Sequence, residues 1–344
     1  MNNYLLNRIF KKFSKPIIVP EIGINHFGSL ANAKKMVDEI KNAGAEIVKV
    51  QIHIPEEEMS KEAHIIKPGN SNKSIYSVIS KNCLSLENEK KLKNYIESKK
   101  LIYLATPFSF KAVDWLIHNK VKIIKIGSGE CNNLPLVDYI ASFKRPIILS
   151  TGMNNLDTVA KSVKLIERRK IPYALLHCVN LYPTDYKLAR LKRILDLRKK
   201  FRKAIIGYSD HTIGNLISIS ALSLGAKIIE KHFRLDKHKK GPDISCSMNK
   251  VDLKNLIEDS NKIYLALSSK KKILKEENVT KKFAFHSVVS KIDILKNTKF
   301  SCKNLTIKRP GIGDFPANKI KFLKNKFAKD FIPKNTLIKK KHVK

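Results

Sequence analysis

Two histidines, His211 and His232, stand at the ends of apolar stretches that read AIIGYSDH and KIIEKHF. If these stretches are neighbouring strands, both imidazoles can face one ion. Two neutral imidazoles with water or substrate oxygens suit Mn, Fe, Co or Zn, and two protein ligands leave the open positions typical of a catalytic metal site. Asp210 and Glu230 could hydrogen-bond these ligands or replace one. The alternative is two strand-end histidines that hydrogen-bond to the backbone.

Lys49 and Lys125 interrupt two other apolar stretches, where an unpaired ammonium group is costly. Each needs an anionic partner, either a bound phosphate or carboxylate or a buried acid such as Glu21. Schiff-base chemistry is the alternative use of a buried lysine. Hydroxyl and amide side chains follow the neighbouring stretches, namely Thr106, Ser109, Ser128, Ser150, Asn180, Tyr182 and Ser209. Many donors and few acceptors around one cavity predict a ligand with several anionic oxygens.

Glu21 is the main acid expected at this cavity. It could act as a general acid or base, or bind a sugar hydroxyl. The alternative is an ion pair with Lys49 or Lys125. From the residues alone we expect a metal-assisted enzyme that acts on a small anionic compound by an aldol-type condensation, an isomerisation or a lyase step.

Eight strand-like stretches must position these residues. Each begins with β-branched residues or leucine and ends in, or runs into, a polar residue. Buried parallel strands are apolar nearly throughout, and polar residues at their carboxyl ends are typical of a (β/α)8 TIM barrel, an α/β fold whose active site lies there. The stretches are Ile17–Gly23, Glu46–Gln51, Leu101–Pro107, Lys122–Gly127, Arg145–Gly152, Tyr173–Val179, Ala204–His211 and Lys227–Phe233.

Helical periodicity fills the intervals between the strands. The segments with this pattern are Leu30–Ala43, Ser74–Ile79, Leu86–Lys99, Leu156–Arg168, Ile213–Leu224 and Val251–Ser268. Between His53 and Asn72 the sequence predicts a loop above the second strand. Such a loop could shape substrate specificity or be a surface embellishment.

The composition changes after residue 269, which predicts a barrel domain over residues 1–269. Residues 270–282 are charged and poor in large apolar side chains, as expected of a linker. Short apolar runs and turn signals predict a small β-rich domain over residues 283–344. The runs are Ser287–Val289, Asn304–Ile307 and Thr336–Ile338. A domain this small is marginally stable alone, so we expect it to pack against a barrel.

The formal net charge of the 344 residues is +38, from 68 lysines and arginines against 30 acids. Such a charge could indicate a nucleic-acid or membrane-surface partner. The basic residues occur in nearly every segment, so we expect solvated lysines and neither a specific nucleic acid nor a membrane as partner.

No run approaches the roughly 20 apolar residues of a membrane span. Five scattered cysteines without a CxxC pair indicate reduced thiols, and we expect a cytoplasmic protein.

A series of short motifs closely resembles the bacterial N-acetylneuraminate (sialic acid) synthases. In chain order the motifs are PEIGINHFG, VKVQ, ATPFS, KIGSGE, STGM, HCVNLYPT, YSDHTIG, EKHF and GPD. The resemblance continues through KNLTIKRPGIG, which is similar to the C-terminal SAF (antifreeze-like) domain of that family. It covers nearly the whole chain after about residue 15.

The resemblance implies a condensation of phosphoenolpyruvate with an N-acetylated amino sugar, which yields a nine-carbon 2-keto sugar acid and phosphate. It implies that His211 and His232 hold a divalent metal, Mn²⁺ first, with Mg²⁺ or Co²⁺ as alternatives, which polarises the sugar aldehyde. Family positions around phosphoenolpyruvate match Lys49, Thr106, Lys125, Ser128, Ser150, Asn180 and Ser209. Positions near the sugar and the phosphate match Glu21, Gln51, Asn70, Tyr182 and Asp243.

Arg309 matches an arginine that the SAF domain inserts into the active site of the partner subunit, where it contacts the N-acetyl group. The resemblance therefore implies a domain-swapped homodimer. The chain departs from the family at Phe27, where an asparagine is usual, and at the start of the SAF-like region. The segment Pro68–Tyr76 is more similar to the sialic or legionaminic type than to the pseudaminic type. Pseudaminate-type sugar specificity, a barrel aldolase with a Schiff-base lysine and a basic nucleic-acid-binding protein remain the alternatives.

Overall fold

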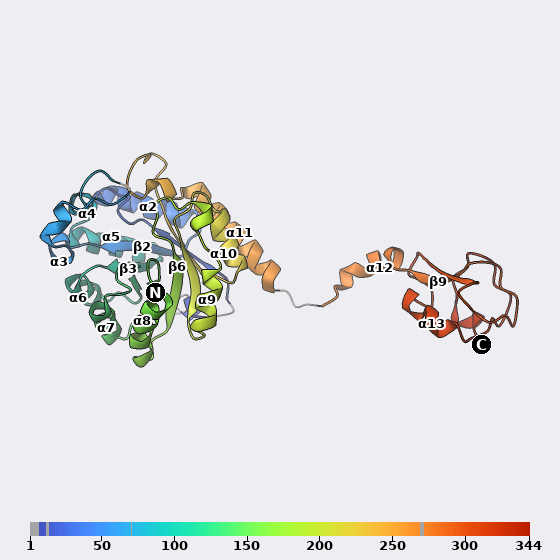
Figure 1. Ribbon diagram of the computed structural model, residues 1–344. Coiled ribbons are helices and arrows are strands. Elements are labelled where there is room, and N and C mark those ends of the chain that lie inside the picture. The colour runs from blue at the N-terminus through green and yellow to red at the C-terminus, as the bar shows by residue number, and fades with distance from the viewer. Residues whose placement is uncertain (1–6, 12–13, 70, 269–271) are drawn as a thin grey trace. The chain divides into compact units, whose positions relative to one another are not determined.

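Eight parallel strands close into a barrel in the computed structural model, which describes residues 7–11, 14–69, 71–268 and 272–344 (Figure 1). Each strand pairs with its neighbour in the chain, and β1 also pairs with β8. The strands are β1 (Ile17–Glu21), β2 (Ile47–Ile52), β3 (Ile102–Pro107), β4 (Ile124–Ile126), β5 (Ile147–Ser150), β6 (Tyr173–Cys178), β7 (Ile205–Asp210) and β8 (Ile228–His232). The predicted (β/α)8 barrel is confirmed.

Alternate residues of each strand belong to two different apolar cores, because successive side chains of a strand point to opposite faces. Ile17 and Val19 of β1 pack inside the barrel, whereas Ile18 packs against the surrounding helices. Ile9, which precedes β1, joins the interior core and is buried at the amino-terminal ends of the strands. Glu21 continues the series of Ile17 and Val19, and so lies on the interior side at the carboxyl end.

Helices surround the barrel (Figure 1). The apolar faces of most of them pack on the outward side of the strands. They are α2 (Leu30–Asn42), α3 (Pro55–Glu58), α4 (Ile75–Asn82), α5 (Leu86–Ser98), α6 (Phe110–His118), α7 (Leu134–Ser142), α8 (Leu156–Arg168), α9 (Arg193–Lys200), α10 (Leu216–Ser223) and α11 (Lys250–Ser268). Serine and asparagine side chains cap several of them; Ser29, Ser85 and Asn155 accept hydrogen bonds from the first turns of α2, α5 and α8. The six predicted helical segments all form; α8 has the predicted ends, and the other five have shifted ends.

The prediction of a loop over His53–Asn72 is wrong in part. The segment contains α3 and a 3₁₀ turn over Lys61–His64. Pro55 occupies the first turn of α3 and three glutamates follow it, which favours a helix start because proline has no N–H to lose there and acidic groups suit the amino-terminal end. A four-residue helix is too short to show an apolar period.

The chain divides into two units, Met1–Ser269 and Lys270–Lys344. The second unit contains α12 (Asn278–Ala284), α13 (Ile320–Leu323) and an antiparallel pair of strands, β9 (Ser287–Ser290) and β10 (Leu305–Lys308). The predicted run at Thr336–Ile338 contributes only an isolated bridge between Leu337 and Val289. The predicted linker includes a 3₁₀ turn and the first part of α12. Residues of β9 and β10 pack with later apolar residues in a core of the unit's own.

In the part of the chain that the structure describes, none of the helices combines the length and the apolar character that crossing a membrane requires. The five cysteines are free thiols.

Candidate active site

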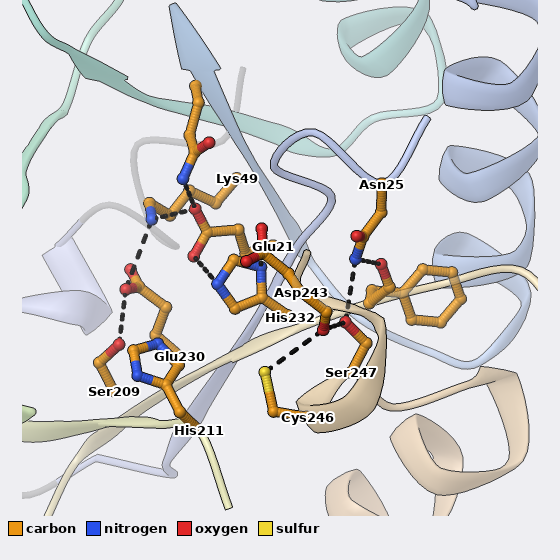
Figure 2. Close-up of polar contacts among 12 residues, drawn as sticks. Glu21, Asn25, Lys49, Ser209, His211, Glu230, His232, Asp243, Cys246 and Ser247 are labelled. Carbon is orange, nitrogen blue, oxygen red and sulfur yellow. Dashed lines mark hydrogen bonds and ion pairs between the residues drawn. The ribbon is translucent and has the colours of Figure 1, made fainter. Parts of the chain in front are cut away.

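A buried network of two lysines and two glutamates lies at the carboxyl ends of β1, β2, β4 and β8. Lys49 Nζ lies 2.6 Å from Glu21 Oε1 and 3.4 Å from Glu230 Oε1. Lys125 Nζ lies 3.5 Å from the same oxygen of Glu230. Figure 2 shows Lys49 between the two carboxylates. Because at least 96% of each of these residues is removed from solvent, the two negative charges balance the two positive ones inside the barrel.

The charge network sets the protonation states of its members. Burial alone would raise the pKa of Glu21, but the charges of Lys49 and His232 and the hydrogen bond from Lys49 lower it to about 2. Burial would lower the pKa of Lys49, yet Glu21 and Glu230 raise it above its ordinary value. Burial lowers the pKa of Lys125, and the charge of Glu230 offsets this only in part. Glu21 is therefore ionised at neutral pH, and an anionic ligand would favour the charged form of Lys125.

Hydroxyl and amide groups complete the polar lining. Lys125 donates to Ser150 Oγ over 2.7 Å, and Ser209 donates to Glu230 Oε1 over 3.0 Å. Thr106 Oγ1 and Asn180 Oδ1 are buried without a hydrogen-bond partner in the protein. Buried polar atoms without partners are rare and costly, so these two atoms point to a polar ligand.

His211 and His232 lie side by side at the mouth, with ring centroids 5.5 Å apart. His211 Nδ1 donates to the carbonyl oxygen of Val179 over 2.8 Å, which leaves Nε2 available. His232 Nδ1 is buried without a hydrogen-bond partner. At metal–nitrogen distances of about 2.0–2.1 Å, two rings at this separation can reach one ion. Among the described residues no group of three or more His, Cys, Asp or Glu side chains is arranged to hold a metal ion.

Asp210 faces away from this site, and its expected role beside the histidines is wrong. Its carboxylate lies 2.9 Å from Lys231 Nζ and accepts a hydrogen bond from Ser218 on α10 over 2.6 Å. The reason is the two-residue period of the strand, which points Ser209 inward and Asp210 outward. Ser109, expected among the donors of the cavity, instead caps α6.

Two connected chambers open at this end of the barrel. The inner chamber, of about 180 Å³, contains both lysines of the network at its floor. The outer chamber, of about 340 Å³, lies next to it. Glu58, Glu130 and Asp243 line it, and no lysine or arginine among the described residues does. The residues that line both are Gln51, Phe108, Glu130, Tyr182 and His232. A compartment with two lysines and several hydroxyl groups and a second compartment with acidic groups but no described lysine or arginine therefore meet at His232 and Tyr182.

The structure brings most of the predicted site residues into the inner chamber, which is lined by Glu21, Lys49, Gln51, Thr106, Lys125, Ser128, Ser150, Asn180, Tyr182, Ser209, His211 and His232. Asp243 lines the outer chamber, with Oδ2 3.9 Å from His232 Nδ1 (Figure 2). Asn70 lies outside the described residues. Arg309 belongs to the second unit, where its Nε donates to the carbonyl oxygen of Ala284.

Several lining residues were not selected from the sequence. Glu230 was considered only as a neighbour of the metal, although it lies two residues before His232 and so shares its inward face. Glu130 lines both chambers with a buried Oε2 that has no partner, and burial raises its pKa. His53 and Glu58 fall in the segment predicted to be a loop. No short sequence pattern marks them.

Comparison with known proteins assigns the family. Residues 36–272 match the model of the NeuB family. The chain belongs to the NeuB family. It is 37% identical over 309 residues to N,N'-diacetyllegionaminic acid synthase of Campylobacter jejuni, a match that covers 87% of this chain and 92% of the relative. It is 31% identical over 326 residues to pseudaminic acid synthase of the same organism, covering 93% and 95%.

A solved structure of N-acetylneuraminic acid (sialic acid) synthetase from Leptospira borgpetersenii resembles this NeuB family member with a TM-score of 0.71 at 30% identity. The match covers 78% of this chain and 90% of that one. Within this chain the NeuB region runs from α2 to just past α11 and includes both lysines and both histidines. Glu21 precedes that region, and the second unit follows it. Its assignment as an SAF domain stays a prediction.

Proposed function

We propose that this chain condenses phosphoenolpyruvate with an open-chain N-acetylated amino sugar and releases a nine-carbon 2-keto sugar acid and inorganic phosphate. Membership of the NeuB family and the names of its relatives support this reaction class. The observation that carries the proposal is the meeting of two unlike chambers. One supplies lysine and hydroxyl donors that suit an anionic enol phosphate, and the other presents acceptors to a neutral, hydroxylated sugar.

Phosphoenolpyruvate would bind in the inner chamber. Lys49 and Lys125 supply positive charge, and Ser128, Ser150 and Ser209 offer hydroxyl groups. The lysines are buried and paired with glutamates, so they hold their positions before substrate enters. A preformed set of donors avoids the cost of reorganising water around each anionic oxygen.

The reaction joins C3 of phosphoenolpyruvate to the aldehyde carbon of the sugar. The electrons of the enol double bond form the new carbon–carbon bond, and the aldehyde oxygen takes up a proton. Water adds at C2 and gives up a proton, and the C2–O bond to phosphate then breaks to leave the 2-keto acid. Glu21 is ionised and receives hydrogen bonds from Lys49 and Gln51, so it can accept a proton or orient a donor group at the boundary of the chambers.

A divalent metal, Mn²⁺ first and Mg²⁺ or Co²⁺ as alternatives, would bind to His211 and His232. The unpaired Nδ1 of His232, the free Nε2 of His211 and the ring separation support such a site. When bound, the ion would act as a Lewis acid on the sugar aldehyde. Because the charges of the two glutamates already balance those of the two lysines, the bound ion would give the site a net positive charge.

The acceptor sugar is N-acetylmannosamine or 2,4-diacetamido-2,4,6-trideoxymannose in this proposal. The higher identity to the diacetyllegionaminic acid synthase than to the pseudaminic acid synthase favours the manno-configured sugars. A domain-swapped homodimer, in which Arg309 of the partner subunit contacts the N-acetyl group, is part of the proposal and accounts for an arginine outside the barrel.

The test is a phosphate-release assay with the purified full chain, phosphoenolpyruvate and Mn²⁺ against a panel of acceptor sugars, including the pseudaminate precursor. We expect equal amounts of phosphate and 2-keto sugar acid with at least one manno-configured sugar. EDTA should abolish turnover and Mn²⁺ should restore it. Phosphate release with no sugar of the panel would overturn the proposal, and turnover with the pseudaminate precursor alone would change the sugar assignment.

A further inference from the structure

His53 and Glu58 form a locked pair beside the outer chamber. His53 Nδ1 lies 2.8 Å from Glu58 Oε1, and the imidazole stacks on the ring of Phe108 with centroids 4.3 Å apart. Only 5% of the His53 side chain and 7% of the Glu58 side chain are exposed. The short helix α3 turns the chain so that Glu58 comes back over His53, which directly follows β2. Stacking and hydrogen bonding together fix the position of the carboxylate.

The pair is connected to the reaction site through Gln51. The Gln51 amide nitrogen donates to Glu21 Oε1 over 2.8 Å, so its carbonyl oxygen faces His53 and accepts from Nε2 over 3.2 Å. With a proton on Nε2, the other ring nitrogen either donates to Glu58 Oε1 or accepts from it. Glu58 Oε2 is an acceptor in both cases.

Glu58 Oε2 is buried and has no hydrogen-bond partner in the protein. The residue lines the outer chamber. An unsatisfied acceptor this deep costs about 1–3 kcal/mol, and a ligand that donates to it would recover that free energy. Oε1 is already held by His53, so the orientation of Oε2 is not free to adjust. Oε2 is therefore an acceptor in a fixed position, and it favours a ligand that has a hydrogen-bond donor opposite it.

One part of the lining of the same chamber is an apolar wall. Its members are Ile24, Met59, Pro68, Ile75, Val78 and Ile79, which come from the loop after β1, the segment between α3 and α4, and α4. An acceptor in an apolar wall matches a substituent that has an N–H next to a methyl group. An acetamido group has both, whereas a hydroxyl group fills only the polar half.

We propose that Glu58, positioned by His53, selects acceptor sugars that carry a second acetamido group, by accepting its N–H while the apolar wall receives its methyl group. This inference rests on the proposed function and deepens it, because it assigns the diacetamido sugar rather than N-acetylmannosamine as the preferred acceptor. Glu58 contacts the substrate and sets specificity. His53 acts through Glu58 and Gln51 and is a positioning residue.

The experiment compares Glu58→Leu with wild type and with Glu57→Leu as the matched control. Glu57 lies on the same helix but is exposed and pairs with Lys111 at the surface. A glutamine at position 58 could donate its NH₂ group to His53 Nδ1 and still present an oxygen to the chamber, whereas leucine removes both oxygens. We expect the ratio of kcat/KM for the diacetamido sugar to that for N-acetylmannosamine to fall about 10-fold to 100-fold in Glu58→Leu, because KM for the diacetamido sugar rises. KM for phosphoenolpyruvate and the Glu57→Leu ratio should stay within about 2-fold of wild type.

His53→Phe tests the positioning role, because the phenyl ring can keep the stack on Phe108 but loses both hydrogen bonds. It should reduce the same specificity ratio, and adding it to Glu58→Leu should cause little further loss. Additive losses in the double variant would contradict the positioning role. Equal loss of both sugars in Glu58→Leu, or no loss, would overturn the specificity assignment while leaving the proposed function intact.

A binding measurement makes the inference testable apart from turnover. The probe is the reduced, non-reacting alditol of the diacetamido sugar, titrated by calorimetry into wild type, Glu58→Leu and Glu57→Leu. We expect Kd to rise about 10-fold or more in Glu58→Leu alone. Wild-type protein that fails to bind the alditol, or binds the N-acetylmannosamine alditol as tightly, would overturn the inference even if another reaction were found.

Discussion

Glu21 and Lys49 are register partners on the neighbouring strands β1 and β2, and their charged atoms lie 2.6 Å apart inside the barrel. The same register places Glu21 beside His232 on β8. One carboxylate therefore joins the lysines of the inner chamber to the imidazole at the boundary of the two chambers. Its protonation state and its partner decide how the site is charged before any substrate binds.

Removing one member of this pair should cost more than removing both. Lys49→Met leaves a buried carboxylate beside Glu230, so we expect the free energy of unfolding to fall by about 3–5 kcal/mol. Glu21→Gln combined with Lys49→Met should recover part of that loss, because the uncompensated charge is gone. Urea unfolding of the two single variants and the double variant measures this coupling. A double variant whose loss equals the sum of the single losses would contradict the pair's importance to folding.

Acid should remove the stabilising effect of Glu21. Its pKa is about 2 in the folded chain against an ordinary 4.5, so its contribution to stability is full above pH 4.5 and is lost as the pH falls toward 2. Glu21→Gln lacks this ionisation. The difference in unfolding free energy between wild type and Glu21→Gln should therefore shrink by about 2 kcal/mol between pH 5 and pH 3. Urea titrations at several pH values test this, and a constant difference over that interval would show that Glu21 is not held ionised.

The site residues at the strand ends could be predicted because alternate side chains of a strand point to the same face, here the inside of the barrel. Ile17, Val19 and Glu21 lie on one face, and so do Ile228, Glu230 and His232. The same alternation places Asp210 on the opposite face from Ser209, although Asp210 was expected from the sequence to lie beside the metal.

The outer chamber was not predictable in the same way. Its fixed acceptor depends on a four-residue helix and on the stacking of His53 against Phe108, a residue from the end of the next strand. Neither the short helix nor the ring stacking produces a repeating pattern of residues that could be recognised in a single sequence. The pairing of both lysines with Glu230 likewise depends on side-chain lengths and on a closed barrel, not on any spacing along the chain.

Lys125 should matter most for phosphoenolpyruvate. Its ammonium group donates to Ser150 and lies near Glu230 at the floor of the inner chamber. Lys125→Met keeps the length and apolar character of the stem but removes the charge, so we expect KM for phosphoenolpyruvate to rise about 100-fold with little change in KM for the sugar. Ser150→Ala should give a smaller change in the same direction. Phosphate-release kinetics separate the two constants, and a change confined to the sugar KM would reassign Lys125 to the other substrate.

Mixing two impaired variants tests whether Arg309 acts in the partner subunit. His211→Ala should abolish turnover through loss of a metal ligand, and Arg309→Ala should weaken use of the sugar. If Arg309 of one chain completes the barrel of the other, a mixed dimer has one barrel with both His211 and Arg309 and one with neither. Random exchange of equal amounts should then restore about a quarter of the wild-type sites, because half of the dimers are mixed and each has one intact site.

The control mixes His211→Ala with His232→Ala, which leaves every barrel of every dimer without a metal ligand and should restore nothing. If the Arg309→Ala mixture shows only the average of its parents at limiting sugar, after native mass spectrometry has verified subunit exchange, Arg309 does not act across subunits.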